Sequence, residues 1–399
     1  MDPEKINYQS KKIVSNKPLL FFIVAIFLFA TTLRTPITIV GPIISFIREG
    51  LGISNVLAGF LTTIPLLAFA VISPFAPRLA RRFGMEWTLF YSVILLCAGV
   101  VLRSVGMTSL LVIGTVLIGI AIAFGNVLIP GYFKLKFPLH IGLLTGIYTV
   151  SMNISSGIAA GFSYSIAQYA GWQIALGFSV ILGVLTLLIW VPLLRTSKVD
   201  MQIPKTTNKP KKMWRHPLAW AIAAAMGLQS FLFYCCAAWI PEIYVSQGLD
   251  AASAGWMVSV MQFAQIPMTF LIPILAGKMT SQRPIVVFFT ICYIIGFSGM
   301  LFEWTSFAVL WMIFLGFAGG ASFGLVLMLF NLRTTTAFEA AELSGFAQSI
   351  GYLVAAIGPV LFGFVHDVTE SWFVPLTLFV VISVLLFFAS FASAKNRTI

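Results

Sequence analysis

Apolar residues occur in long runs along the whole chain, and short polar or glycine- and proline-rich breaks separate these runs. A transmembrane helix needs about 20 consecutive, predominantly apolar residues. The runs predict an all-α membrane protein of twelve transmembrane helices. The expected ranges are 19–46, 55–77, 87–105, 109–133, 142–168, 173–194, 217–240, 254–276, 284–302, 307–331, 342–365 and 373–394.

One polar interruption is much longer than the others. It covers 195–216, carries seven basic residues and contains Pro204 and Pro210, so it predicts a linker between two halves of six spans each. The expected parts are a tail (1–18), an N-terminal six-helix bundle (19–194), the linker (195–216), a C-terminal six-helix bundle (217–394) and a second tail (395–399).

Landmarks in the first half recur in the second half at a nearly constant spacing. The matching pairs are Ala58-Gly59 with Ala254-Gly255, Leu117–Ala121 with Phe314–Ala318, Leu144–Gly146 with Leu343–Gly345, and Trp172 with Trp372, at offsets of 196, 197, 199 and 200 residues. Such a repeat is typical of secondary transporters, whose substrate site lies between two pseudo-symmetric bundles near the membrane midplane. Since the sequence has no nucleotide-binding loop, ATP-driven pumping by this chain is not expected.

Composition and charge agree with a lipid environment. Charged residues make up only 9% of the chain, against about 25% in an average soluble domain. When the spans alternate across the membrane, 21 of the 24 Lys and Arg residues fall on one side, Arg48 and Arg103 on the other, and Arg34 within a span. The positive-inside rule therefore puts both termini in the cytoplasm. The expected location is the cell membrane, in a bacterium the inner membrane, and nucleic acid is not an expected partner.

The cysteines suggest packing rather than chemistry. All four, Cys97, Cys235, Cys236 and Cys292, fall inside apolar runs and lack metal-ligand spacing. We interpret them as small packing residues and expect neither disulfides, nor a metal site, nor a cofactor. The expected partners are a small-molecule substrate and membrane lipids, and the chain is expected to function as a monomer.

Arg34 is the most informative residue, because it lies about fifteen residues into the first span. A charge at the bilayer centre costs roughly 2.5–3.5 kcal/mol, so Arg34 must face a wet cavity or a partner. The central parts of the spans contain no Asp, Glu or His that could neutralise it. The simplest partner is an anionic or strongly accepting substrate. The structural alternative is a bond to carbonyls freed by Pro36, or to Gln and Tyr side chains.

Other polar residues deep in the spans are candidates for the same cavity. Helical spacing places Thr31, Thr35 and Thr38 on the face of Arg34, and Pro36 with Gly41-Pro42 loosens the helix beside that face. The remaining candidates are Asn126, Tyr148, Ser151, Gln229, Tyr234, Gln262, Gln265, Gln348 and Tyr352. For each of these, hydrogen bonding between helices is an equally good explanation.

The missing buried carboxylate also bears on coupling. Proton-driven carriers usually need a titratable group inside the membrane. Without one, the remaining options are facilitated diffusion, exchange, or a proton carried on the substrate itself as its neutral acid.

The loop after the second span, Pro77–Glu86, resembles the loop signature of the major facilitator superfamily, Gly-x-Leu-Ala-Asp-Arg-x-Gly-Arg-Arg. The matching residues are Leu79, Ala80, Arg82 and Gly84. Arg81 replaces the usual Asp, Pro77 the first Gly and Glu86 a terminal basic residue, so the usual gating ion pair would be reversed in sign or lost. The residues with an implied gating role are Arg78, Arg81, Arg82, Gly84 and Glu86.

Further stretches extend the likeness through both halves: Leu33–Pro36 with Val40–Pro42, Ala80–Gly84, Gly125–Pro130, Phe137-Pro138, Gln229-Ser230, Trp239–Pro241, Leu343–Gly345 and Gln348–Tyr352. In combination they resemble the cyanate and 2-nitroimidazole transporter (CynX/NimT-type) family. The resemblance implies two six-helix bundles that work by alternating access. It also implies a small planar anion or azole as substrate, which would stack on aromatic residues and bond to Arg34.

Three other functions are to be weighed at this point. An efflux transporter for drug-like compounds would favour a large aromatic cavity and usually a buried acid for cationic drugs, and the spans lack such an acid. A membrane sensor or receptor would normally carry a soluble output domain, for which the linker and short tails leave no room. An intramembrane enzyme would need a nucleophile–base or metal constellation, which the spans also lack.

Overall fold

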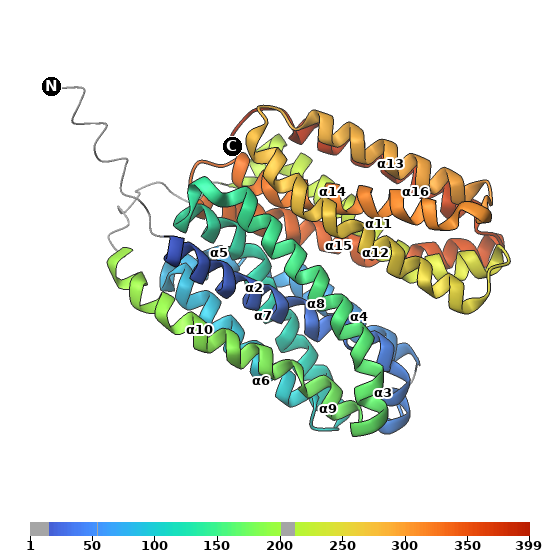
Figure 1. Ribbon diagram of the computed structural model, residues 1–399, viewed down its shortest axis with the longest axis horizontal. Helices are drawn as coiled ribbons and strands as arrows, with labels where there is room; N and C mark the ends of the chain where they lie inside the picture. Colours follow the sequence, from blue (N-terminus) through green and yellow to red (C-terminus); the bar gives the residue numbers. More distant parts are fainter. Residues whose placement is uncertain (1–15, 54, 201–211) are drawn as a thin grey trace.

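The computed structural model describes residues 16–53, 55–200 and 212–399, and the regular structure in these ranges is helical (Figure 1). The first half contains α2 (Asn16–Thr38), η1 (Gly41–Ile43), α3 (Ile44–Leu51), α4 (Asn55–Ile72), α5 (Ala76–Phe83), α6 (Met85–Arg103), α7 (Thr108–Lys136), η2 (Pro138–His140), α8 (Ile141–Ala170), α9 (Trp172–Gly177) and α10 (Ser179–Asp200). The second half contains η3 (Met213–Arg215), α11 (Pro217–Ser246), α12 (Ala251–Lys278), α13 (Arg283–Leu301), η4 (Thr305–Phe307), α14 (Ala308–Leu332), α15 (Ala337–Thr369) and α16 (Phe373–Ser393).

The spans agree with the sequence. Within the described residues, eleven segments are long and apolar enough to cross a membrane, and Thr63–Ile72 with Ala76–Phe83 forms a twelfth that is bent by 57°. The predicted all-α fold of twelve spans in two bundles is therefore confirmed. The predicted tail and linker lie partly outside the described residues, since 1–15 and 201–211 (with Pro204 and Pro210) are not described, and α10 continues to Asp200.

The first span differs from the single helix expected over 19–46. Helix α2 ends at Thr38, and the chain continues through η1 into α3. Pro42 has no backbone N–H and favours a break. Just before it, the Val40 N–H bonds to the Ile37 carbonyl at 3.4 Å, one residue closer than in an α-helix. The span is thus broken on the C-terminal side of Arg34.

The two bundles touch at one end of the molecule and separate at the other (Figure 1). We call the touching end the basic end, because α5 with Arg78, Arg81 and Arg82 lies there, as does the C-terminal end of α7 with Lys134 and Lys136. The opposite end is called the open end. Both the start of α2 and the C-terminus of the chain lie at the basic end.

Small residues bring the bundles together at the basic end. A Cβ atom at Gly142 of α8 would lie 2.7 Å from the Pro273 carbonyl oxygen of α12, and one at Gly345 of α15 would lie 2.5 Å from the Ser73 carbonyl oxygen. Either contact leaves no room for a side chain. Glycine at these positions lets backbones of opposite bundles approach closely, as in other membrane helix pairs.

The same helices are apart at the open end. At Gly157 and Gly161 of α8 and Gly255 of α12, a Cβ atom would have no neighbouring atom within 4 Å. Between α4 and α15, an apolar groove of about 770 Å³ separates the bundles. Its lining residues are Thr63, Leu67, Leu353, Ala356, Ile357, Val360, Leu361 and Phe364.

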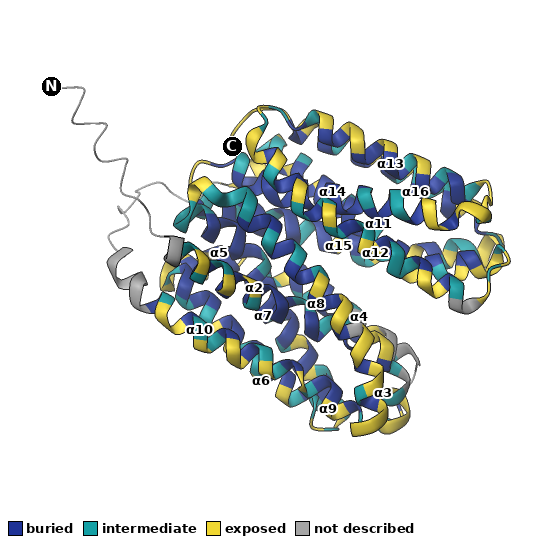
Figure 2. Cartoon of the chain, in the orientation of Figure 1, coloured by how far each residue is buried: buried dark blue, intermediate teal, exposed yellow. Residues whose placement is uncertain are grey.

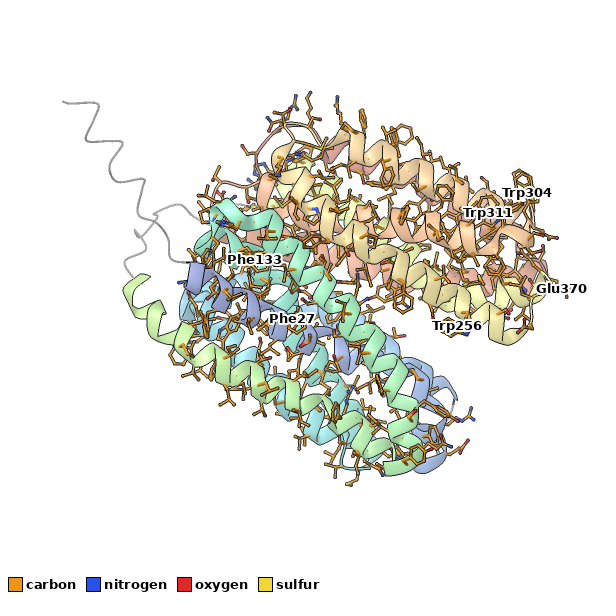
Figure 3. The ribbon with its side chains drawn as sticks, in the orientation of Figure 1. Phe27, Phe133, Trp256, Trp304, Trp311 and Glu370 are labelled. Atoms are coloured by element: carbon orange, nitrogen blue, oxygen red, sulfur yellow. The ribbon has the colours of Figure 1, made fainter. Side chains whose placement is uncertain are left out.

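The outer surface suits lipid. Exposed apolar side chains are spread along the outward faces of the helices (Figure 2), for example Leu188 at 66% and Phe388 at 63% exposure. Trp256 and Trp304 are exposed near the open end (Figure 3). Tryptophan is enriched where a membrane meets water, so these rings fit one boundary of the bilayer.

The surroundings of Arg103 were not predicted from the sequence. This residue ends α6, and only 1% of its surface is exposed. The sequence alone does not show this burial, because the atoms that surround Arg103 come from other helices. Among the described arginines, Arg103 and Arg333 are buried, with 1% and 2% exposure, whereas Arg34 is half-buried.

The contacts that fix the third span also follow the internal repeat. In the first half, Glu86 at the start of α6 pairs with Lys136 at the end of α7, with Oε1 and Nζ 2.8 Å apart. In the second half, Arg333 donates a hydrogen bond from Nη2 to Gln282 Oε1. Gln282 follows Glu86 by 196 residues and Arg333 follows Lys136 by 197, within the range of offsets found from the sequence. The start of the third span is therefore linked to the end of the fourth span in both bundles. The link is an ion pair in the first bundle and an arginine–glutamine hydrogen bond in the second.

Candidate functional site

A cavity lies between the two bundles, and helices of both contribute to it. Its volume is about 50 Å³. The lining residues of the first half are Arg34, Asn126, Tyr148, Met152 and Asn153. Those of the second half are Met226, Gln229, Ser230, Phe233, Tyr234, Gln265, Gly319, Phe323, Leu327, Gln348 and Tyr352. The described wall is therefore rich in amides and aromatic rings, with a single charged side chain.

Arg34 brings that charge into the cavity from α2. Its Cζ atom lies 5.6 Å from the centroid of the Phe233 ring, a cation–π contact between the bundles. Its Nε atom is buried and has no hydrogen-bond partner among the described residues. The Tyr148, Tyr234 and Tyr352 side chains lie within electrostatic range of the guanidinium. Among the described lining residues there is no carboxylate to neutralise it.

One hydrogen-bond network ties the cavity wall together across the bundle interface. The Gln348 Nε2 atom donates to the Asn126 carbonyl at 3.0 Å and to Ser344 Oγ at 2.7 Å. The Tyr148 hydroxyl donates to Asn126 Oδ1 at 2.8 Å. Helices α7, α8 and α15 are thereby linked beside the cavity.

Two further amides line the wall and are held by neighbouring side chains. The Gln229 Nε2 atom donates to Ser230 Oγ at 2.7 Å, on the same helix. The Asn153 Nδ2 atom of α8 donates to Thr269 Oγ1 of α12 at 3.4 Å. A solute in the cavity would meet amide groups whose orientation is already fixed, which lowers the entropy cost of binding it.

Eight of the thirteen candidate residues line the cavity, and five do not. Thr31, Thr35 and Thr38 share the face of Arg34 but are not among the residues that line the cavity. The Thr31 hydroxyl donates to the Leu28 carbonyl at 2.7 Å and Thr38 to the Arg34 carbonyl at 3.2 Å, so their hydroxyls bond to their own helix. Gln262 is exposed on α12, three residues before the buried Gln265.

Ser151, the remaining candidate, also lies outside the cavity. Its hydroxyl donates to the Ile147 carbonyl of its own helix at 2.6 Å. The sequence reasoning in turn missed eight lining residues: Met152, Asn153, Met226, Ser230, Phe233, Gly319, Phe323 and Leu327. Asn153 could have been found, because it is an amide deep in a span. The apolar residues carry no signal that separates a cavity wall from a lipid face.

The predicted gating loop joins the bundles at the basic end. Arg81 of α5 pairs with Glu342 of α15, with Nη2 and Oε1 2.6 Å apart, and its Cζ lies 5.0 Å from the centroid of the Phe338 ring. An ion pair is therefore present, with a cation where the superfamily loop has Asp. Gly84 has a φ of 88°, which favours glycine, and it ends α5 so that α6 can begin at Met85.

The other loop residues have separate roles. Glu86 pairs with Lys136 inside the first bundle. Arg78 and Arg82 are exposed, and their Cζ atoms lie 5.7 Å and 5.3 Å from the centroids of the Phe75 and Phe83 rings. Among the loop cations, only Arg81 makes a described ion pair with the opposite bundle.

Lys134 provides a second link at the basic end. From α7 of the first bundle, its Nζ donates to the carbonyls of Asn331, at 2.8 Å, and Thr334, at the end of α14 in the second bundle. A helix C-terminus carries partial negative charge and free carbonyls, so a cation is stabilising there. The basic end is thus closed by two cations of the first bundle.

Comparisons with known proteins agree on one family. A family model described as the Major Facilitator Superfamily matches residues 20–359. The "Uncharacterized transporter YycB" of Bacillus subtilis (strain 168) is 44% identical over 382 residues, which cover 95% of this chain and 94% of the relative. The "2-nitroimidazole transporter" of Escherichia coli (strain K12) is 36% identical over 387 residues, which cover 97% and 98%.

Among solved structures, the proton:xylose symporter XylE bound to 6-bromo-6-deoxy-D-glucose matches with a TM-score of 0.80. The match covers 96% of this chain and 98% of the symporter chain at 14% sequence identity, so it supports the fold alone.

Proposed function

Because the chain belongs to the major facilitator superfamily, we propose that it moves a small planar solute, anionic or azole-like, across the membrane by alternating access, with Arg34 contacting the solute. The protein is a multi-pass membrane transporter and not an enzyme. The family resemblance drawn from the sequence is confirmed by the match to the 2-nitroimidazole transporter.

The guanidinium without a counter-charge carries this proposal. Arg34 has a buried Nε without a hydrogen-bond partner and meets no carboxylate among the described cavity residues. A hydrogen bond to a charged group contributes about 1.5–3 kcal/mol. A solute with a carboxylate, cyanate or nitro oxygen would supply the missing acceptor, and a planar acceptor group suits the guanidinium fork.

The size and lining of the cavity support a small, flat solute. Pockets for drug-sized ligands usually measure about 300–1,000 Å³, whereas this cavity measures about 50 Å³. Phe233, Tyr234 and Tyr352 offer rings for stacking, and the amides of Gln229 and Gln265 can both donate and accept hydrogen bonds. The 36% identical relative from Escherichia coli is a 2-nitroimidazole transporter, which fits an azole as the solute.

We further propose that the basic end faces the cytoplasm, by the positive-inside rule. The described conformation, closed at the basic end and separated at the open end, would then be the outward-facing state of an alternating-access cycle. Rocking of one bundle against the other around the central site is the usual motion of such carriers.

Solute binding to purified protein tests the role of Arg34. The variants are Arg34→Met, which removes the charge, and Arg34→Lys, which keeps the charge but loses the planar fork. Arg48→Met is the matched control, because Arg48 is exposed on α3 near the open end. The probes are 2-nitroimidazole and cyanate, with binding measured by calorimetry and uptake measured in proteoliposomes.

Both Arg34 variants are expected to raise the solute Kd about 10- to 150-fold, the range that corresponds to a lost charged hydrogen bond. Arg48→Met should bind as the native protein does. If Arg34→Met binds the probes with native affinity, Arg34 does not contact the solute. If neither probe binds the native protein, the solute class is wrong.

A further inference from the structure

Arg103 is a fully buried arginine, and solute contact does not explain it. It occupies the last turn of α6 and is 1% exposed. A Cβ atom at Gly114 of α7 would lie 2.6 Å from the Arg103 backbone nitrogen and 2.7 Å from its Cβ. The glycine therefore lets α7 pack directly against the base of the arginine, which buries it. Arg103 does not line the central cavity.

Among the described residues, the guanidinium makes a single hydrogen bond, to the helix that carries Arg34. Its Nη1 donates to the Pro36 carbonyl of α2 at 2.8 Å. In an unbroken helix that carbonyl would accept from the N–H of residue 40. Here the Val40 N–H bonds to the Ile37 carbonyl instead, because α2 ends at Thr38. The break frees the Pro36 carbonyl, and Arg103 binds it.

The remaining donors of Arg103 are unused. Its Nε and Nη2 atoms are buried and have no hydrogen-bond partner in the described structure. Burying a cation with one neutral acceptor is costly, and an apolar side chain of similar size would normally be more stable there. Packing alone therefore does not account for an arginine at this position.

In the second bundle, the equivalent contact between helices is made by an uncharged side chain. Met300, 197 residues after Arg103, lies near the end of α13. There the Gln247 Nε2 atom, which follows α11, donates to the Met300 carbonyl at 2.8 Å. The first and third spans of that half are thus joined by an amide. The charged version occurs in the half whose first helix is broken and carries the cavity arginine.

We propose that Arg103 is a positioning residue for solute binding, which holds the broken end of α2 so that Arg34 points into the cavity. A cation at the C-terminal end of a helix also stabilises the helix dipole. The bond fixes Pro36, two residues after Arg34, while Thr38 Oγ1 donates to the Arg34 carbonyl from the other side of the proline. The proposal rests on the proposed contact between Arg34 and the solute.

The experiment uses three substitutions in the full-length protein. Arg103→Met removes every side-chain donor, whereas Arg103→Lys keeps the charge and an ammonium group that can donate. Arg333→Met is the matched control, because Arg333 is the other described arginine with 2% exposure or less, and its hydrogen bonds go to Ser393 and Gln282, away from the cavity. The solute probe is 2-nitroimidazole, and its Kd is measured by calorimetry.

A thiol reporter follows the position of the helix end independently of the solute. Gly41 is exposed and has no atom within 4 Å of a Cβ position, so Gly41→Cys should be tolerated. Its rate of labelling by a membrane-impermeant maleimide is measured in membranes, with the protein lacking Gly41→Cys as the blank. This readout does not require that any variant survive purification.

Arg103→Met should raise the labelling rate at position 41 several-fold and the solute Kd about tenfold, and Arg103→Lys should restore most of both. Arg333→Met should lower the unfolding temperature only. The proposal is overturned if Arg103→Met leaves the labelling rate unchanged, or if Arg333→Met changes it equally. If the labelling rate responds to Arg103→Met but Arg34→Met keeps native affinity, the contact between Arg34 and the solute has failed, and Arg103 only holds the helix.

Discussion

The ion pair between Arg81 and Glu342 offers the sharpest prediction about the transport cycle. It joins the bundles at the basic end, and the two side chains are 29% and 12% exposed. An alternating-access cycle must break this pair whenever the basic end opens. We therefore predict that Glu342→Gln shifts the population toward a conformation that is open at the basic end.

The size of the shift follows from the strength of the ion pair. A solvent-exposed ion pair contributes about 0.2–1 kcal/mol, because water screens it. Its loss changes the ratio of the two conformations by a factor of about 1.4 to 5.

Distances between spin labels at the open end measure this ratio. Tyr169 at the end of α8 and Val368 at the end of α15 are 88% and 67% exposed, so labels at these positions should not disturb the packing. The labels are attached to cysteines in a chain whose four native cysteines are replaced by alanine. Glu342→Gln should increase the fraction of short distances, because the open end closes when the basic end opens.

The charge swap is the matched control. Arg81→Glu combined with Glu342→Arg restores an ion pair and puts the carboxylate beside the positive helix end, so the distribution should return to the native one. Arg81→Glu alone puts two carboxylates together and should shift the population further than Glu342→Gln. If the double variant behaves as the sum of the two single ones, the pair does not hold the basic end closed.

Three further predictions follow from other parts of the molecule. Gly142→Ala should weaken closure at the basic end and reduce uptake into proteoliposomes, because the new Cβ would lie 2.7 Å from the Pro273 carbonyl oxygen. The control Gly157→Ala has open space around position 157 and should transport normally. Exchange flux at equal solute concentrations should be flat between about pH 5.5 and 8.5 for a solute that does not titrate there, because the described cavity wall contains no Asp, Glu or His; a step or bell in that range would reveal a titrating protein group. Cysteines at positions 208 and 250 should label from opposite sides of the membrane, and labelling of both from outside intact cells would contradict the twelve-span topology.

The fold could be predicted from the sequence because the lipid bilayer constrains the composition and length of every span. Every span must be apolar over about 20 residues and helical throughout, so the runs alone predicted all twelve spans. The break in the first span after Thr38 was only hinted at by Pro36 and Gly41-Pro42. The Pro36 carbonyl beside this break accepts a hydrogen bond from Arg103 of α6, and no local sequence pattern reveals that partner.

Only the polar residues of the site could be predicted from the sequence. Asn126, Gln348 and the other long polar side chains were found because a polar group inside a membrane must face something polar. Thr31 and Thr38 were misplaced, since a hydroxyl can bond to its own helix and then needs no cavity. Phe233 was missed because an aromatic ring is equally common against lipid, and only the position of the Arg34 guanidinium distinguishes it.

The reversed ion pair at the basic end also links the evolution of one position in each bundle, 81 and 342. If position 81 changed to the Asp that is usual in the superfamily loop, two carboxylates would face each other across the bundle interface, since Glu342 lies opposite. If Glu342 changed first, Arg81 would be left against the positive end of α15. Either single step is unfavourable, so the two positions are expected to change together in descendants of this chain. For the same reason, a chimera of this N-terminal bundle with a relative's C-terminal bundle should close properly only when the relative supplies an acidic residue at the position of Glu342.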